Sequence, residues 1–460
     1  MPNATLKIDD IRFILTLDPE RRIMRDGAIV VDGTEITRIG KAADLKDVSA
    51  DRVIDGSEMV ATPGFINGHL HISYAHATRG IFPDSLEPVD YLGNVFRLAL
   101  QMRPEEERLT SLLALTECLK YGTTTVVDPG TTRNPDVCMK AYEESGARVI
   151  IGASVTDLPN AINVPLVGLE EAERLMESTV KQFDGALDGR VRAWTMPADV
   201  SSSSKELLRA AKRIADDNGT RMTIHCVNSP QSVQAHLGNY GRRPIEWLED
   251  IGVLGPNVLL AHVVGLDDSE VDCVARSDTK MVMCPTAAVK MGAGTSSRGR
   301  LPEMIERGVT VGLGTDSANN SCVAEVMRSM YLAAVLYKDG RGTTGMVPAE
   351  KALEMATIDG ARALGLESDI GSLEVGKKAD IVLFDTRRPE WRTLFNPVNS
   401  LVYNADGRSV HTVLVDGRTV VENQKPTFVD EWELIEKVQS IGADMLSRTG
   451  TRFPQPWPIV

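Results

Sequence analysis

Five side chains able to bind a metal ion stand at the ends of short apolar runs in this sequence. The chain has only seven histidines, and four of them hold such positions together with one aspartate: His69, His71, His225, His262 and Asp316. His69 and His71 flank Leu70, and residues two apart in an extended strand point to the same side. A lone histidine at a strand end is more often structural, but five buried polar groups need shared partners. Imidazole and carboxylate are ligands of divalent metals, so the set predicts a metal site.

Apolar runs alternate with amphipathic segments between residues 62 and 366, and this alternation predicts parallel strands linked by helices. Helical spacing is clear in KELLRAAKRIADD (205–217) and AEVMRSMYLAAVLYK (324–338). Eight such units in about 300 residues predict a (β/α)8 TIM barrel of the α/β class. Because active sites lie at the carboxyl ends of barrel strands, the five side chains should converge there. The strand candidates are GFINGHLH, TTTVVDP, ARVIIGASV, VRAWTMPA, RMTIHCV, VLLAHVV, KMVMCP and VTVGLGTD.

The two ends of the chain share a different sequence pattern, which predicts short strands of alternating apolar and polar residues joined by tight turns. GAIVVDGTEITRIG turns at Asp32-Gly33, and HTVLVDGRTVVENQ turns at Asp416-Gly417, which are hairpin signals. We therefore expect residues 1–61 and 367–429 to pair into one small β-sandwich domain. Residues 430–460 should form a C-terminal helix followed by a Pro-rich tail.

Charge and hydropathy exclude several classes of partner. The net charge of −14 argues against nucleic acid or an anionic membrane surface. No apolar run approaches the ~18 residues of a membrane span, and the amino terminus lacks the pattern of a signal peptide. Six scattered cysteines favour reduced thiols in a reducing compartment. We expect a cytoplasmic homo-oligomer that acts on a small molecule.

Three longer segments resemble the amidohydrolase superfamily, in its branch of cytosine deaminase-like and chlorohydrolase-like enzymes. PGFINGHLH (63–71) is similar to the first-strand signature of that branch, and GTTTVVD (122–128) is similar to its second strand. ATIDGARALGLESDIGSLEVGKKADIVLFD (356–385) resembles its return into the sheet domain. The resemblance covers nearly the whole chain and implies a metal-dependent hydrolase.

This resemblance implies roles for the five side chains. His69, His71, His225 and Asp316 would bind the metal, with His262 next to the water that the metal activates. Such an ion lowers the pKa of water toward about 7. Asp316 would accept the proton and pass it to the leaving nitrogen, while His262 would orient the nucleophile.

The fourth strand bears on the number of metal ions. Binuclear members of the superfamily use a carboxylated lysine there, and VRAWTMPAD (191–199) has none. We expect one divalent ion per chain. Zinc is the first choice, with iron, cobalt and manganese as alternatives, because spacing does not select among them.

Two departures from ring deaminases bear on the substrate. Those enzymes carry a proton-donating glutamate three residues after the strand-five histidine, where this chain has Asn228, and an amide cannot transfer a proton. Polar groups of their seventh strand are replaced here by Met283, Ala287 and Ala288. With Tyr74 nearby, the expected pocket is apolar, and Asn228, Tyr74, Met283 and Ala288 are the candidate substrate contacts. The pattern is similar to the phenylurea hydrolase and molinate hydrolase group, and predicts hydrolysis of a neutral urea, carbamate, thiocarbamate or amide.

Two alternatives stay open at this point. One is an aminohydrolase that deaminates a ring amine, with Asn228 or water relaying the proton. The other is a non-catalytic relative that keeps the barrel as an assembly module, although such proteins lose metal ligands. The remaining histidines, His76, His236 and His411, are expected to be structural, and His76 is the one that could line the pocket mouth.

Overall fold

Eight short parallel strands form the barrel in the computed structural model, which describes residues 3–83, 85–160, 164–452 and 457. Four strands pair in the order β10-β8-β7-β6 and four in the order β12-β13-β14-β15. The halves meet through a parallel bridge between Thr195 and Met222, and Gly68 N donates to Leu313 O at 2.8 Å on the closing side. The strands are β6 (Phe65–Asn67), β7 (Thr123–Val127), β8 (Arg148–Ile151), β10 (Val191–Ala193), β12 (Met222–Cys226), β13 (Val258–His262), β14 (Lys280–Met283) and β15 (Val311–Leu313).

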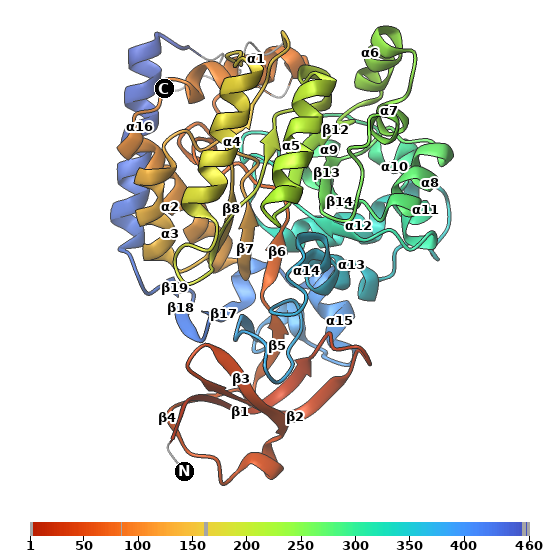
Figure 1. The fold of residues 1–460 in the computed structure, drawn as a ribbon. Coiled ribbons are helices and arrows are strands. Elements are labelled where there is room, and N and C mark those ends of the chain that lie inside the picture. The colour runs from red at the N-terminus through yellow and green to blue at the C-terminus, as the bar shows by residue number, and fades with distance from the viewer. Residues whose placement is uncertain (1–2, 84, 161–163, 453–456, 458–460) are drawn as a thin grey trace.

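Helices cover the outside of the barrel and confirm the expected TIM-barrel class (Figure 1). Helix α5 shows why these segments fold as they do. Ser204 accepts a hydrogen bond from Leu207 N as the N-cap, and Leu207, Leu208, Ala211 and Ile214 bury one face. The helices are α1 (Pro88–Ala99), α2 (Pro104–Lys120), α3 (Pro135–Ser145), α4 (Leu169–Phe183), α5 (Lys205–Asp217), α6 (Pro230–Tyr240), α7 (Pro244–Asp250), α8 (Asp268–Ser277), α9 (Pro285–Lys290), α10 (Thr295–Arg298), α11 (Leu301–Glu306), α12 (Val326–Gly340), α13 (Ala349–Ala356), α14 (Ile358–Leu364), α15 (Pro397–Asn399) and α16 (Glu431–Thr449).

Strands from both ends of the chain join in one nine-stranded sheet, at the lower end of the view in Figure 1. Apolar side chains of its two parts, such as Ile8 and Ile29 against Ile381 and Leu414, share one core, as two layers of a sandwich do. The strands are β1 (Ala4–Leu15), β2 (Ile23–Asp32), β3 (Glu35–Lys41), β4 (Ala50–Asp55), β5 (Met59–Pro63), β16 (Ile381–Asp385), β17 (Val410–Val415), β18 (Arg418–Glu422) and β19 (Lys425–Pro426). The expected sheet from the chain ends is therefore present.

Two features fix the barrel against its neighbours. At the end nearer the sheet, the buried guanidinium of Arg148 pairs with Asp380 and Asp416 of the sheet segments. On the side, α16 packs on α2 (Figure 1).

Part of the Pro-rich tail lies outside the described residues. No helix in the described part of the chain has the length and apolarity that a membrane span requires.

Candidate metal centre

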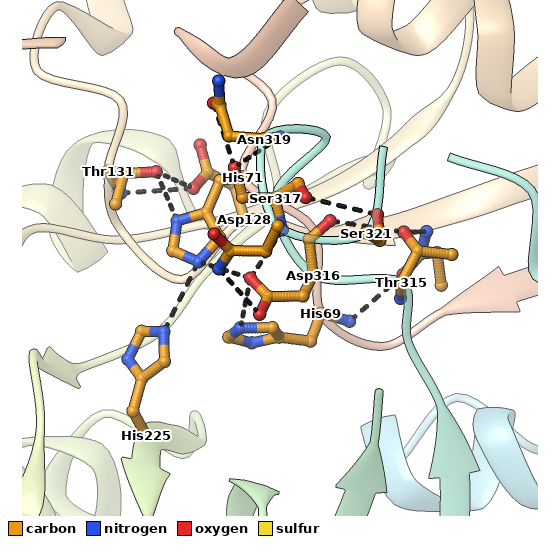
Figure 2. Close-up of polar contacts among 12 residues, drawn as sticks. His69, His71, Asp128, Thr131, His225, Thr315, Asp316, Ser317, Asn319 and Ser321 are labelled. Atoms are coloured by element: carbon orange, nitrogen blue, oxygen red, sulfur yellow. Dashed lines mark hydrogen bonds and ion pairs between the residues drawn. The ribbon is translucent and has the colours of Figure 1, made fainter. Parts of the chain in front are cut away.

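Three imidazoles and one carboxylate meet at the carboxyl ends of the barrel strands. The ring nitrogens of His69, His71 and His225 lie within 4.8 Å of one another. Asp316 Oδ1 is 3.4 Å from His71 Nε2 and 3.9 Å from His69 Nε2. Figure 2 shows these side chains pointing toward a common centre. The structure therefore brings together the four residues that the sequence nominates as ligands.

His262 completes this cluster from the end of β13. Its ring centroid lies 4.9 Å from that of His69, and its ring stacks on that of His225 at 5.4 Å. Both His262 and Asp316 have left-handed backbone conformations, with φ of 77° and 63°. Non-glycine residues adopt this region at a cost and often do so at functional sites. The strained strand ends turn these two side chains into the barrel mouth.

Two properties of the cluster suit a bound cation: the neutral state of His69 and His225, and the absence of hydrogen-bond partners for the ring nitrogens of His69. Burial, followed by the neighbouring imidazoles, lowers the pKa of His69 well below its usual value and that of His225 to about 3, so both rings are neutral. His69 is 1% exposed, and neither of its ring nitrogens has a hydrogen-bond partner in the described structure. Leaving a buried polar atom unpaired costs free energy. Three imidazoles with a carboxylate are a ligand set for zinc or a similar divalent ion, so the residues fit such a metal.

Contacts outside the cluster orient two of the imidazoles. His225 Nδ1 lies 2.5 Å from Ala198 O, and His71 Nδ1 lies 3.2 Å from Thr131 Oγ1. A carbonyl accepts only from a protonated nitrogen, which leaves Nε2 of His225 with its lone pair toward the centre. The segment after strand four thus contacts the cluster through the backbone carbonyl of Ala198, which accepts from His225.

Asp128 and Thr131 lie behind His71, and neither was among the site residues expected from the sequence. Thr131 donates to Asp128 Oδ1 at 2.9 Å and contacts His71 with the same hydroxyl, as Figure 2 shows. Thr132 also donates to Asp128. Burial raises the pKa of Asp128, and these hydrogen bonds counter that effect. Because Asp128 ends the apolar run TTTVVD, the criterion that selected Asp316 would also have selected it.

Asp316 is held as an anion. Ser317 N donates to its Oδ1 at 2.5 Å, and Asn320 Nδ2 donates to its Oδ2 at 3.2 Å. Burial alone would raise the pKa of Asp316, but the contacts with His71 and the other imidazoles lower it well below its usual value. A carboxylate in this state can bind a cation and can accept a proton.

Replacing Thr131 by valine should weaken metal binding by about 10- to 100-fold, as loss of support behind a ligand does. The change keeps the side-chain shape but leaves His71 Nδ1 without its partner. Competition with a zinc chelator measures the affinity. Thr132→Val is the matched control, because it removes a hydroxyl from Asp128 without touching His71. Equal affinities of the two variants would show that Thr131 does not support the ligand.

The four residues expected to contact substrate lie in different surroundings. Tyr74 is buried, and its ring centroid is 5.9 Å from that of His71. Met283 is also buried and belongs to the main apolar core. Ala288 is half-buried on α9, and Asn228 is exposed. Tyr74 thus stands beside the metal centre, and the roles of the other three stay predictions.

The remaining histidines have structural surroundings. His236 packs between Tyr240 and Trp247, with ring centroids at 4.6 and 5.1 Å. His411 lies in β17 and contacts the neighbouring Thr412 hydroxyl. His76 Nε2 lies 3.0 Å from Glu117 Oε2 in a buried charged cluster behind the site.

Curated relatives of this chain are deaminases. It is 32% identical over 437 residues to the 5'-deoxyadenosine deaminase of Methanosarcina acetivorans, across 95% of this chain and 97% of that protein. It is 31% identical over 430 residues to the 5-methylthioadenosine/S-adenosylhomocysteine deaminase of Syntrophobacter fumaroxidans, across 93% of this chain and 95% of that protein.

Solved structures share the fold over almost the full length. Atrazine chlorohydrolase TrzN from Arthrobacter aurescens TC1, complexed with zinc, superposes with a TM-score of 0.88 at 26% identity and covers 95% of this chain and 100% of its own. A zinc-bound adenosine deaminase from Xanthomonas campestris has the same TM-score at 23% identity, covering 97% of this chain and 100% of its own, a likeness of fold alone.

These relatives overturn the expected reaction. A urea, carbamate, thiocarbamate or amide substrate is wrong as the main prediction, and the likeness to phenylurea and molinate hydrolases is not supported, because the full-length relatives are named as ring-amine deaminases. The error came from inferring the reaction from Asn228. The lack of a carboxyl group at this position on strand five does not by itself imply an acyl substrate, because Asp316 can accept and deliver a proton.

The match to a known family spans most of the molecule. Residues 60–420 match the Amidohydrolase family, which agrees with the barrel, the sheet from the chain ends and the cluster of His69, His71 and His225. This chain belongs to the amidohydrolase family of metal-dependent hydrolases.

Proposed function

We propose that this protein is a zinc-dependent aminohydrolase that removes the amino group from the ring of an adenosine-like nucleoside and releases ammonia. The observation that carries the proposal is the convergence of three imidazoles with the anionic Asp316 at the barrel mouth. The adenosine-like substrate class comes from the names of relatives that align over more than nine-tenths of the chain.

The residues of the site divide the chemistry among them. His69, His71, His225 and Asp316 would hold one zinc ion, which supplies Lewis acidity and makes water a stronger acid. Asp316 accepts a proton from the attacking water and delivers it to the leaving amino nitrogen. His262 orients the attacking oxygen from the end of β13. The overall change adds water to the ring carbon, breaks its bond to the amino nitrogen and leaves a carbonyl and ammonia.

Ammonia release from a panel of ring amines tests the proposal. The zinc-loaded protein should release ammonia from 5'-deoxyadenosine or 5'-methylthioadenosine, with adenosine, guanine and an aminotriazine as comparison substrates. An enzyme-coupled ammonia assay and mass spectrometry of the product, which gains oxygen in place of NH, provide independent readouts. Zinc-replete protein that releases ammonia from no member of the panel would contradict the proposal.

A non-catalytic assembly role has less support. All four nominated ligands lie close to one another, and neither ring nitrogen of the buried His69 has a hydrogen-bond partner in the described chain. A protein retained only for assembly has no need for this arrangement.

A further inference from the structure

Two segments of the chain carry the side chains around the metal centre. The segment after β6 contains His71 and Tyr74, and the segment after β15 contains Asp316. They are far apart in sequence, and neither is a regular helix or strand where it meets the other. Their relative position therefore depends on side-chain contacts, and two buried polar residues provide them.

Glu117, on α2, contacts both segments from behind the site. Its Oε2 accepts from Arg79 and lies 3.0 Å from His76 Nε2, both in the first segment. Its Oε1 accepts from Ala324 N, in the second segment, at 3.3 Å. Burial would raise the pKa of Glu117, but His76 and Arg79 lower it to about 2, so the group is a carboxylate with full charge. One side chain thus joins both segments to the same helix.

Asn319 makes the second connection, directly between the segments. It is fully buried, and its Nδ2 donates to Thr78 O at 2.8 Å and to Thr78 Oγ1 at 3.0 Å. The backbone carbonyl of Asn319 accepts from the Tyr91 hydroxyl at 2.6 Å, which adds α1 to the assembly. Figure 2 shows Asn319 next to Ser317, and its backbone N donates to the Ser317 hydroxyl at 3.2 Å.

The first segment is also confined on its outer side. Gly442 of α16 approaches so closely that a Cβ there would lie 2.4 Å from Ala77 O. With α16 outside and Glu117 inside, residues 75–79 have little room to move. Tyr74, which precedes them, is held with its ring beside His71 and its hydroxyl next to Ser317 of the second segment.

We propose that Glu117 and Asn319 are positioning residues that clamp the segment after β6 to the segment after β15, and so hold Tyr74 against the Asp316 side of the site. Neither residue touches the metal ligands through its side chain. Their effect on turnover would pass through the placement of Tyr74 and Asp316, where displacements of about 1 Å can change rates by 10²-fold.

Glu117→Gln is the first test, because the amide keeps the size of the side chain and removes its charge. The zinc-loaded variant should retain metal but show faster hydrogen–deuterium exchange in residues 72–80 and 317–325. Its kcat should fall by about 10- to 100-fold, with a smaller change in KM. Asn319→Ala is the second variant and should accelerate exchange in the same two segments.

Glu303→Gln is the matched control. Glu303, on α11, is a similarly buried carboxylate (15% exposed against 17% for Glu117) that binds Arg300 and Arg341. Its loss should lower the thermal midpoint without accelerating exchange in either segment. If Glu117→Gln and Asn319→Ala behave like this control in exchange and kcat, the clamp is refuted. Only the predicted change in kcat rests on the proposed function. Hydrogen–deuterium exchange and metal content are measured without substrate, so they test the clamp even if the protein deaminates none of the ring amines.

Discussion

Asp316→Asn should abolish measurable turnover, with a loss of about 10²- to 10⁴-fold, the range that general acid–base groups contribute. The carboxylate is held anionic next to His71. An amide of the same shape can still accept the hydrogen bond from Ser317 N, but it cannot take a proton from water. Steady-state ammonia release, measured together with zinc content, separates loss of chemistry from loss of metal.

Asp380→Asn provides the control for this prediction. Asp380 is also a buried carboxylate, but it pairs with Arg148 at the end of the barrel nearer the sheet. Its variant should be less stable and yet retain turnover per folded molecule. If zinc-replete Asp316→Asn turned over within about tenfold of the wild-type rate, well inside the range for such a group, Asp316 would have no part in proton transfer.

His69→Ala should remove the metal as well as the activity. His69 has the most buried ring of the cluster, and neither of its ring nitrogens has a hydrogen-bond partner in the described structure. A ring nitrogen of His69 is therefore available to bind a metal ion. Zinc should raise the thermal midpoint of the wild-type protein, because a ligand that binds only the folded state stabilises it by about 2.7 kcal/mol at a hundred times its Kd. The variant should show no such shift.

His236→Ala is the matched control, since His236 is buried among aromatic rings and has no place in the cluster. That variant should keep its zinc and its zinc-dependent shift.

Elemental analysis of the wild-type protein should give close to one ion per chain, because strand four has no lysine to bridge a second. Two tightly bound ions of equal occupancy would refute the mononuclear site.

Local patterns in the sequence were sufficient for the elements themselves. The segment 205–217 forms α5 with the expected bounds, because its apolar spacing and the Ser204 cap are both local properties. At Asp416-Gly417 both residues have positive φ, of 49° and 72°, as a two-residue hairpin turn requires. The metal ligands could be nominated for a similar reason: each follows an apolar run, and barrel strands end at one rim.

Contacts between segments distant in sequence could not be predicted from local residue spacing. His71 and Thr131 are 60 residues apart, and Glu117 and Ala324 are 207 apart. Each contact depends on how the strands align and where the barrel closes, which no local spacing encodes. β6 ends at Asn67, so His69 and His71 lie beyond the paired strand, His69 within a bend, and neighbouring segments orient them.

The substrate prediction was overturned by the relatives, which are named as deaminases. That prediction placed Asn228 where ring deaminases hold an acid, because Asn228 is the third residue after His225. In the structure, Val227 has a φ of 52° and Asn228 is exposed. The sequence by itself determined the barrel, the sheet from the chain ends and which side chains meet at the barrel mouth, since these follow from local periodicity and strand ends. Only the tertiary structure decided which groups support those side chains and which face solvent, because that depends on backbone turns and packing between distant segments.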